Sequence, residues 1–226
     1  MKHNFLKIKH KEVTYRPWES DYWNAVCDGA ELRLSRERIY TLGNYLQYAM
    51  AEQGDVIEMG VYKGCTAYVL GSIINSNDNG KRVMYLCDTF TGTPETFCKD
   101  KGDRDRSGKY SDTSLEYVKM KMNQCFDRCV FVQGFIPDSL TGIGDAVKFC
   151  FAHIHLNLYE STRTAVLWLR DRMNRGGLVF IEDYGICDCK GVRRAVDELV
   201  DEGILRIVYL PTGQAVASIV EGGIID

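Results

Sequence analysis

The chain alternates between short apolar runs and longer segments in which apolar residues recur every three or four positions. Strand-type runs lie at residues 55–60, 83–88, 129–134, 147–155 and 178–183. The spacing between them predicts amphipathic helices at 66–74, from 113 onward, at 162–174 and at 191–202. The sequence Arg175-Gly176-Gly177 predicts the end of the helix at 162–174.

This alternation predicts an α/β fold, because strands linked through helices form a parallel sheet with helices on both faces. Two final strands, at 206–210 and 215–220, are joined by the short turn 211–214 and must run antiparallel. Five β/α units followed by such a hairpin describe the mostly parallel, seven-stranded, Rossmann-like sheet of class I methyltransferases.

The N-terminal part, residues 1–53, is predicted to be a helical extension. Its aromatic residues in polar surroundings are Tyr15, Trp18, Tyr22 and Trp23. They either cap a pocket or pack one side of a helix, and we favour packing. A second helix is predicted to open at Ser35.

Composition and charge exclude several classes of function. Lys and Arg number 28 and Asp and Glu 31, so the net charge of −3 gives no basic face for nucleic acid. No apolar segment is long enough to span a bilayer, and residues 1–7 lack the apolar stretch of a signal peptide. Nine cysteines are scattered without C-x-x-C pairs, as reduced thiols are. We therefore expect a cytoplasmic protein with no nucleic-acid or membrane partner.

A ligand of an open α/β sheet binds beyond the carboxyl ends of the strands. Each predicted strand here ends in polar residues or glycine. Gly60 and Gly64 would let the backbone approach a ligand closely. The middle glycine of the dinucleotide fingerprint is missing, which argues against an NAD-dependent reductase.

Two carboxylates follow the first two strands. Glu58 suits an amino-bearing ligand such as the methionine part of S-adenosylmethionine, and Asp88 suits the two hydroxyls of a ribose. Either residue alone could simply cap a turn. Their joint placement predicts a site for S-adenosylmethionine.

Several blocks of sequence resemble the macrocin O-methyltransferase family. They are Gly54-Asp55-Val56-Ile57-Glu58-Met59-Gly60-Val61-Tyr62-Lys63-Gly64, the segments 88–94 and 158–162, and Glu182-Asp183-Tyr184 followed by 191–197. The resemblance implies S-adenosylmethionine as methyl donor, bound by residues 54–226, and a sugar hydroxyl of a natural product or glycan as acceptor. Segment 97–112 and the aromatic N-terminal stretch would wall the acceptor, and homo-oligomer formation stays open.

The resemblance also assigns further cofactor contacts. Gln133, Gly134 and Phe135 would flank the adenine. The cofactor-binding set is then Glu58, Gly60, Tyr62, Gly64, Asp88, Thr89, Gln133, Gly134, Phe135 and His155.

One departure from the family concerns its Mg²⁺ site. The resemblance implies aspartates after the fourth and fifth strands, but this chain carries His155 and Asn157 after the fourth and Glu182-Asp183 after the fifth. Because Mg²⁺ prefers oxygen ligands, the loss of carboxylates should weaken its binding. Asn157, Glu182 and Asp183 remain as candidate metal ligands.

His155 has three interpretations. It could be the general base, with Asp183 orienting the imidazole. It could complete a metal site with Glu182 and Asp183 that favours Mn, Fe or Zn. It could also be a structural histidine in a repurposed relative. We favour the general base and hence O-methylation, with N- or phosphate-directed methylation and a catalytically silent S-adenosylmethionine-binding protein as rivals.

Overall fold

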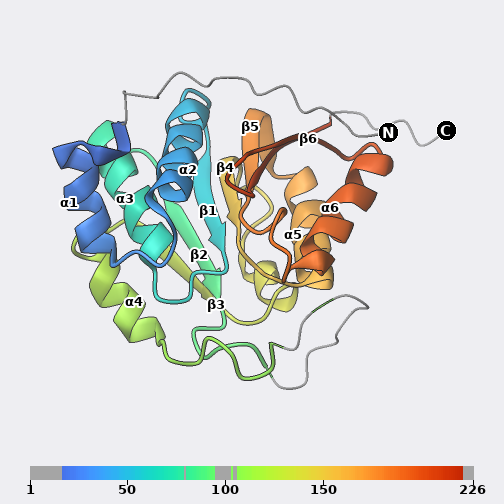
Figure 1. Ribbon diagram of the computed structural model, residues 1–226, viewed down its shortest axis with the longest axis horizontal. Helices are drawn as coiled ribbons and strands as arrows, with labels where there is room; N and C mark the ends of the chain where they lie inside the picture. Colours follow the sequence, from blue (N-terminus) through green and yellow to red (C-terminus); the bar gives the residue numbers. More distant parts are fainter. Residues whose placement is uncertain (1–16, 79, 95–102, 104–105, 221–226) are drawn as a thin grey trace, which may run out of the picture.

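A seven-stranded sheet forms the centre of the molecule (Figure 1). The computed structural model describes residues 17–78, 80–94, 103 and 106–220, so Tyr15 and part of the predicted loop 97–112 lie outside it. The strand order is β3-β2-β1-β4-β5-β7-β6. The strands are β1 (Asp55–Met59), β2 (Met84–Asp88), β3 (Cys129–Gln133), β4 (Phe149–Ile154), β5 (Met173–Ile181), β6 (Leu205–Tyr209) and β7 (Ala215–Ile219).

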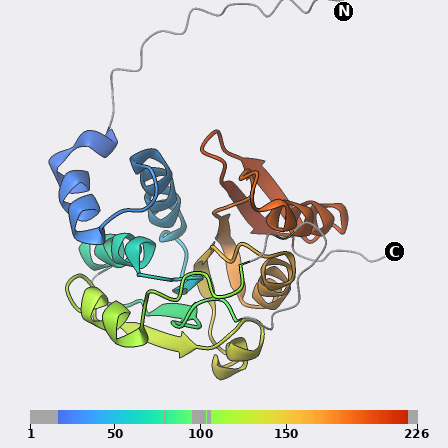
Figure 2. The same cartoon turned by 60° about the horizontal axis from the view of Figure 1, so that its bottom comes forward.

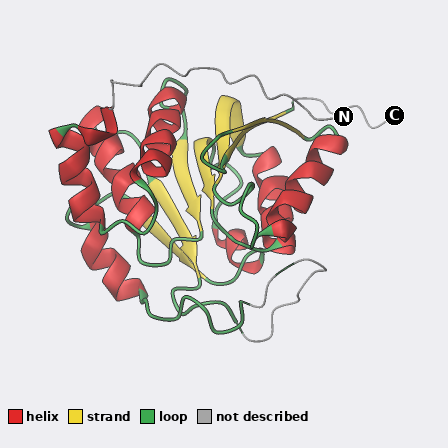
Figure 3. Cartoon of the chain, in the orientation of Figure 1, coloured by secondary structure: helices red, strands yellow, loops and turns green. Residues whose placement is uncertain are grey.

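Only β7 runs antiparallel to its neighbours β5 and β6, while the pairs among β1 to β5 are parallel. The predicted sheet with its closing hairpin is therefore confirmed. Its strands lie between two layers of helices, as Figure 3 shows.

The helices divide between the two faces of the sheet (Figure 2). They are α1 (Asp21–Ala30), α2 (Arg36–Ala49), α3 (Cys65–Asn77), α4 (Leu115–Met122), α5 (Tyr159–Arg170) and α6 (Lys190–Asp201), with 3-10 turns η1 (Pro17–Glu19) and η2 (Asp138–Gly142). The buried side chains of α1 to α4 form one apolar cluster on one face, and those of α5 and α6 belong to a second on the other. Alternate strand residues supply both clusters, as a period of two requires: Val56 belongs to the first and Ile57 to the second.

Serine caps start the N-terminal helices. The side chain of Ser20 accepts a hydrogen bond from the amide of Trp23 in α1, and Ser35 does the same for Arg38 in α2. Trp23 is buried, and the Trp18 and Trp23 rings both contact Tyr40 of α2. The described aromatic residues of this stretch therefore pack helices against each other, the interpretation that we favoured.

The prediction of a helix that ends at Arg175-Gly176-Gly177 was wrong. Helix α5 ends at Arg170, and β5 begins at Met173 and runs through the glycine pair. The register of β5 against β4 shifts here, since Phe149 pairs with Met173 but Phe151 with Leu178. Gly176 takes a φ of +80°, so the glycines form an irregular part of a strand instead of a helix end.

Candidate active site

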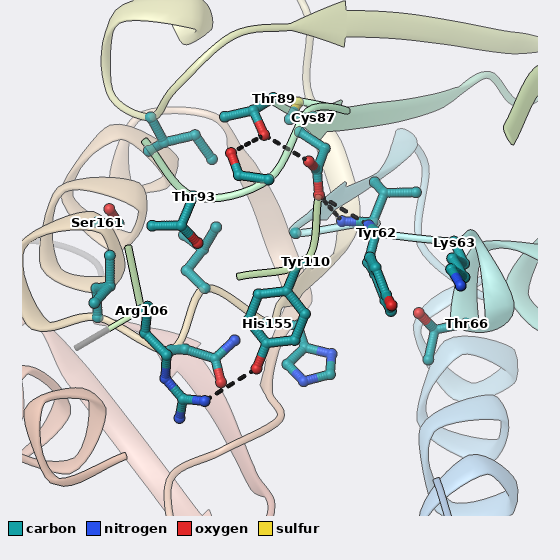
Figure 4. Close-up of a pocket in the computed structure, with 18 of the residues that line it drawn as sticks. Tyr62, Lys63, Thr66, Cys87, Thr89, Thr93, Arg106, Tyr110, His155 and Ser161 are labelled. Carbon is teal, nitrogen blue, oxygen red and sulfur yellow. Dashed lines mark hydrogen bonds between the residues drawn. The ribbon is translucent and has the colours of Figure 1, made fainter. Parts of the chain in front are cut away.

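A cavity of about 380 Å³ opens at the carboxyl ends of the parallel strands (Figure 4). This volume is within the range of small-molecule sites. Residues of the sheet edge that line it include Gly60, Val61, Tyr62, Asp88, Thr89, Gly134, Phe135, Ile136, His155 and Asn157. The N-terminal part adds Arg33, Leu34 and Ile39, and the segment before α4 adds Arg106 and Tyr110.

Gly60 permits the close approach of β1 and β4 at the cavity floor. Its φ is +91°, and a Cβ atom placed there would lie 2.1 Å from the carbonyl oxygen of His155. Gly64 has a φ of +71° and forms the N-cap of α3, but it does not line the cavity. Both glycines therefore shape the turn, and only Gly60 borders the ligand space.

Replacement of Gly60 by alanine should move the floor of the cavity. A Cβ overlap with backbone has no flexible side chain to relieve it, so we expect a loss of about 1–3 kcal/mol in folding free energy. Affinity for S-adenosylhomocysteine should fall at least about tenfold, that is about 1.4 kcal/mol. Urea unfolding and calorimetry measure the two effects. Gly142→Ala is the matched control because nothing lies within 4 Å of its Cβ position; equal behaviour of the two variants would contradict the prediction.

The Asp88 carboxylate ties β2 to the glycine turn. One oxygen accepts from the amides of Val61 and Tyr62 at 2.7 and 2.8 Å. The other accepts from the Phe90 amide at 2.8 Å. The Thr89 hydroxyl lies 3.2 Å from this oxygen, but its single proton has a shorter acceptor in the Gly92 carbonyl at 2.7 Å. The carboxylate therefore keeps an acceptor position for a ribose hydroxyl.

Tyr62 lines the cavity, and its hydroxyl donates to Asp112 at 2.5 Å. Gly134 and Phe135, which follow β3, also line the cavity. Gln133 is exposed and does not line it, and its side-chain amide donates to the carbonyl of Thr89 at 3.2 Å. The structure thus brings Gly134 and Phe135 into the pocket and leaves Gln133 outside.

Glu58 lies behind the cavity wall, contrary to the prediction that it faces the ligand. Its side chain is fully buried and does not line the cavity. It accepts hydrogen bonds from the Thr66 hydroxyl and, at 3.1 Å, from Nδ1 of His153. Thr66 lines the cavity, so Glu58 is linked to it only through this hydroxyl. The alternation of β1 explains this placement, because it points residue 58 toward the α3 face of the sheet.

His153 links two buried carboxylates. Its ring is completely buried, with Nδ1 3.1 Å from Glu58 and Nε2 3.2 Å from Glu182. Burial by itself would lower the pKa of His153. The hydrogen bonds and charges of Glu182 and Glu58 outweigh that effect and raise the pKa to about 9. His153 is therefore an imidazolium between two carboxylates at neutral pH.

Glu182 and Asp183 follow β5 and are held by groups from distant parts of the chain. Nη2 of Arg38 lies 2.7 Å from Glu182 and 3.4 Å from Asp183. The Gln214 side-chain amide lies 2.9 and 3.0 Å from the two Glu182 oxygens. Burial tends to raise the pKa of Asp183, but the charges of His155 and Arg38 hold that pKa at about 2. Both carboxylates are therefore ionised and paired.

His155 lies between the buried Glu182–Asp183 pair and the cavity. Its side chain is 25% exposed and lines the pocket beside Tyr110, while Nε2 lies 3.3 Å from an Asp183 oxygen. Burial tends to lower the pKa of His155, but the Asp183 charge outweighs this and the pKa is raised above 6.5. Nδ1 makes no hydrogen bond to the residues that the structure describes. An imidazole that gives Nε2–H to Asp183 keeps the Nδ1 lone pair to accept a proton.

The candidate metal ligands do not fit Mg²⁺. Asn157 lines the cavity and accepts from the Cys189 thiol at 3.5 Å, whereas Glu182 and Asp183 lie outside the lining and are paired with Arg38. Mg²⁺ requires nearly octahedral oxygen ligands, and these oxygens already serve other partners. Within the described ranges, no group of three or more His, Cys, Asp or Glu side chains is arranged to hold a metal ion. The expected metal set is therefore not brought together.

Sequence reasoning missed several residues of the site. The sequence did contain one indication of a role for Arg38. This residue lies four positions before Leu42, so a charged side chain stands in line with the apolar face of α2. Arg106 and Tyr110 lie in the segment expected to wall the acceptor, but their pairing at 3.1 Å had no sequence signature. Gln214 sits in the turn of the closing hairpin, where nothing in the local pattern predicted a buried contact.

The strand order β3-β2-β1-β4-β5-β7-β6, with a glycine turn after β1, is that of the class I methyltransferase fold. The chain belongs to the macrocin O-methyltransferase family: the family model described as Macrocin-O-methyltransferase (TylF) matches residues 18–206. This membership confirms the predicted family and enzyme class.

Known relatives share moderate identity with the chain. The 8-demethyl-8-(2,3-dimethoxy-alpha-L-rhamnosyl)-tetracenomycin-C 4'-O-methyltransferase of Streptomyces olivaceus is 27% identical over 146 residues, covering 61% of this chain and 55% of that protein. The demethyldecarbamoylnovobiocin O-methyltransferase of Streptomyces niveus is 25% identical over 205 residues, covering 84% and 76%. The structure of the O-methyltransferase NovP superimposes with a TM-score of 0.72 at 23% identity, covering 82% of this chain and 80% of that one. The structural similarity confirms the fold.

Proposed function

We propose that the protein transfers the methyl group of S-adenosylmethionine to a hydroxyl of a sugar, of a sugar-containing natural product or of a glycan. Both Streptomyces relatives are named as O-methyltransferases, and one name specifies a rhamnosyl group. The lining of the cavity suits the donor. Gly60 has no side chain that would keep a ligand away from the backbone, and Phe135 and Ile136 offer apolar surface for an adenine. Asp88 lies between these two residues and the glycine turn.

His155 is the proposed general base, and Asp183 is the proposed orienting carboxylate. Bound S-adenosylmethionine supplies an electrophilic methyl group that an oxygen attacks in line. The new C–O bond forms as the C–S bond breaks, and Nδ1 of His155 takes the hydroxyl proton. Asp183, ionised and 3.3 Å from Nε2, stabilises the imidazolium that results.

The observation that carries this proposal is the position of His155, between the cavity and an ionised carboxylate. Its test is release of S-adenosylhomocysteine with a panel of free sugars, glycosides, amines and phosphate esters. Turnover on the sugar hydroxyls supports the proposal. Turnover confined to amines or phosphates, or donor binding without any turnover, would refute it in favour of the other two hypotheses.

Asp88→Ala should weaken binding of S-adenosylhomocysteine by about 1–3 kcal/mol, through the loss of charge-assisted hydrogen bonds. The variant frees the amides of Val61 and Tyr62 and so loosens the turn at the donor site. Calorimetry measures the change. Asp138→Ala, in an exposed position on η2, is the control. Equal affinity of Asp88→Ala and the wild type would remove Asp88 from the site.

The proposal also covers the location of the protein, its partners and its domain organisation. None of the helices in the described part of the chain has the length and apolarity needed to cross a bilayer. We propose a cytoplasmic enzyme with a small-molecule or glycan acceptor and no nucleic-acid partner. We also propose that residues 1–53 cap the donor domain 54–226, since Arg33, Leu34 and Ile39 line the cavity.

A further inference from the structure

Two adjacent carboxylates at the end of β5 are removed from water. Glu182 is fully buried and Asp183 is 6% exposed. Ionised carboxylates in such surroundings are strongly destabilised unless a cation and hydrogen-bond donors compensate them. The pair therefore needs cationic partners, and His153 and His155 each contact one of its four oxygens.

Arg38 of α2 supplies a further cationic partner. Its Nη2 atom lies 2.7 Å from Glu182 Oε1 and 3.4 Å from Asp183 Oδ1, and it donates to the main-chain carbonyl of Glu182 at 2.9 Å. The guanidinium is itself largely buried, with 16% of the side chain exposed. One nitrogen thus contacts both carboxylates at once, as a bridging cation would.

Neighbouring groups hold this arrangement in place. Gln214 donates to the carbonyl of Arg38 at 3.2 Å as well as to both oxygens of Glu182. Nε2 of His153 lies 3.2 Å from Glu182 Oε2, and Nε2 of His155 lies 3.3 Å from Asp183 Oδ2. Three of the four carboxylate oxygens accept a hydrogen bond from a nitrogen, while Asp183 Oδ2 has no hydrogen-bond partner among the described residues and has only the ion-pair contact with His155.

We infer that Arg38 is a built-in cation for the Glu182–Asp183 pair and excludes a divalent metal ion from it. A divalent ion would need the oxygens that Arg38 contacts, and it would be repelled by the guanidinium at short range. Arg38 acts on the proposed base only through Asp183, so it is a positioning residue. The inference goes beyond methyl transfer, because it concerns the carboxylate pair whichever acceptor is used.

The arrangement also links the N-terminal part to the reaction site. Arg38 is carried by α2, whereas its partners follow β5, so this cation reaches the pair only when α2 is docked on the sheet. Loss of Arg38 would leave Glu182 and Asp183 with His153 and His155 as their charged partners and would free the oxygens that Arg38 contacts for another cation.

Binding of Mn²⁺, followed by electron paramagnetic resonance, tests the inference without an acceptor. We expect no stoichiometric binding to the wild-type protein. Arg38→Ala should bind one equivalent at least about tenfold more tightly than the wild type, because the freed oxygens favour a hard cation. Arg36→Ala is the matched control: Arg36 lies on the same helix but donates to Asn24 and should gain nothing.

The outcomes separate cleanly. One equivalent of Mn²⁺ on the wild type, or a folded Arg38→Ala with no gain over Arg36→Ala, would overturn the inference. Arg38→Lys retains a cation and should resemble the wild type. If Arg38→Ala does not fold, the wild-type and Arg38→Lys titrations decide, since stoichiometric binding to either one refutes exclusion and its absence from both supports it. Calorimetry with S-adenosylhomocysteine on the same samples tests the proposed function separately.

Chemical rescue by guanidinium tests whether Arg38 acts by positioning Asp183. Once an acceptor is known, added guanidinium should restore part of the turnover that Arg38→Ala loses, and it should not affect Arg36→Ala. A purely structural role for Arg38 predicts no such rescue.

Discussion

Replacement of His155 by alanine is expected to lower turnover about 10²–10⁴-fold, the usual contribution of a general base. The ring lies at the cavity with Nε2 on Asp183, so its removal leaves the acceptor hydroxyl without a proton acceptor. Binding of S-adenosylhomocysteine should change much less than turnover. Gln133→Ala is the control, because Gln133 lies close to the pocket without lining it.

The same reaction should depend on pH and little on metal. The pKa of His155 is raised above its ordinary 6.5 by Asp183, with Glu182 adding to the effect and His153 opposing it. Only the neutral ring accepts a proton, so turnover should fall as the pH drops below this raised pKa.

EDTA should leave turnover nearly unchanged. If chelation abolished activity while His155→Ala retained most of it, a metal mechanism would replace the one proposed.

His153→Ala should destabilise the fold by about 3–5 kcal/mol, the cost typical of removing one partner from a buried ion pair. The variant leaves Glu58 and Glu182 fully buried without the imidazolium between them. Urea unfolding at neutral pH measures the loss. The double variant His153→Leu with Glu58→Gln is the comparison, and it should recover part of the stability because it removes a buried charge together with its partner.

The stabilisation by His153 should depend on pH with a definite sign. Its pKa in the folded protein is about 9, above its ordinary 6.5, so the contribution is complete below pH 6.5 and is lost as the pH rises through 9. The pKa of Glu182 is lowered despite its burial, chiefly by His153, so its contribution is lost instead in acid. The difference in Tm between the wild type and His153→Ala should shrink from pH 6.5 to pH 9. A constant difference over this range would show that His153 is neutral in the fold.

Local patterns were enough to predict the strands, the closing antiparallel pair and the family. Apolar runs and amphipathic spacing are properties of consecutive residues, and the short turn at 211–214 requires an antiparallel pair whatever surrounds it. The same holds for Gly60, because a strand followed by a tight turn requires a residue that tolerates a positive φ. The glycine pair at 176–177 misled the prediction since glycine ends a helix and interrupts a strand equally well.

The partners of the charged residues were decided only by the tertiary structure. Arg38 lies far along the chain from Glu182, and Gln214 comes from the closing hairpin, so no local pattern could pair them. Glu58 was expected at the ligand, but the sheet turned it toward His153. The sequence by itself determined which residue types stand at the strand ends, because that follows from strand position. Which of them face the cavity and which neutralise one another depends on helices packed from elsewhere, and only the folded arrangement sets those distances.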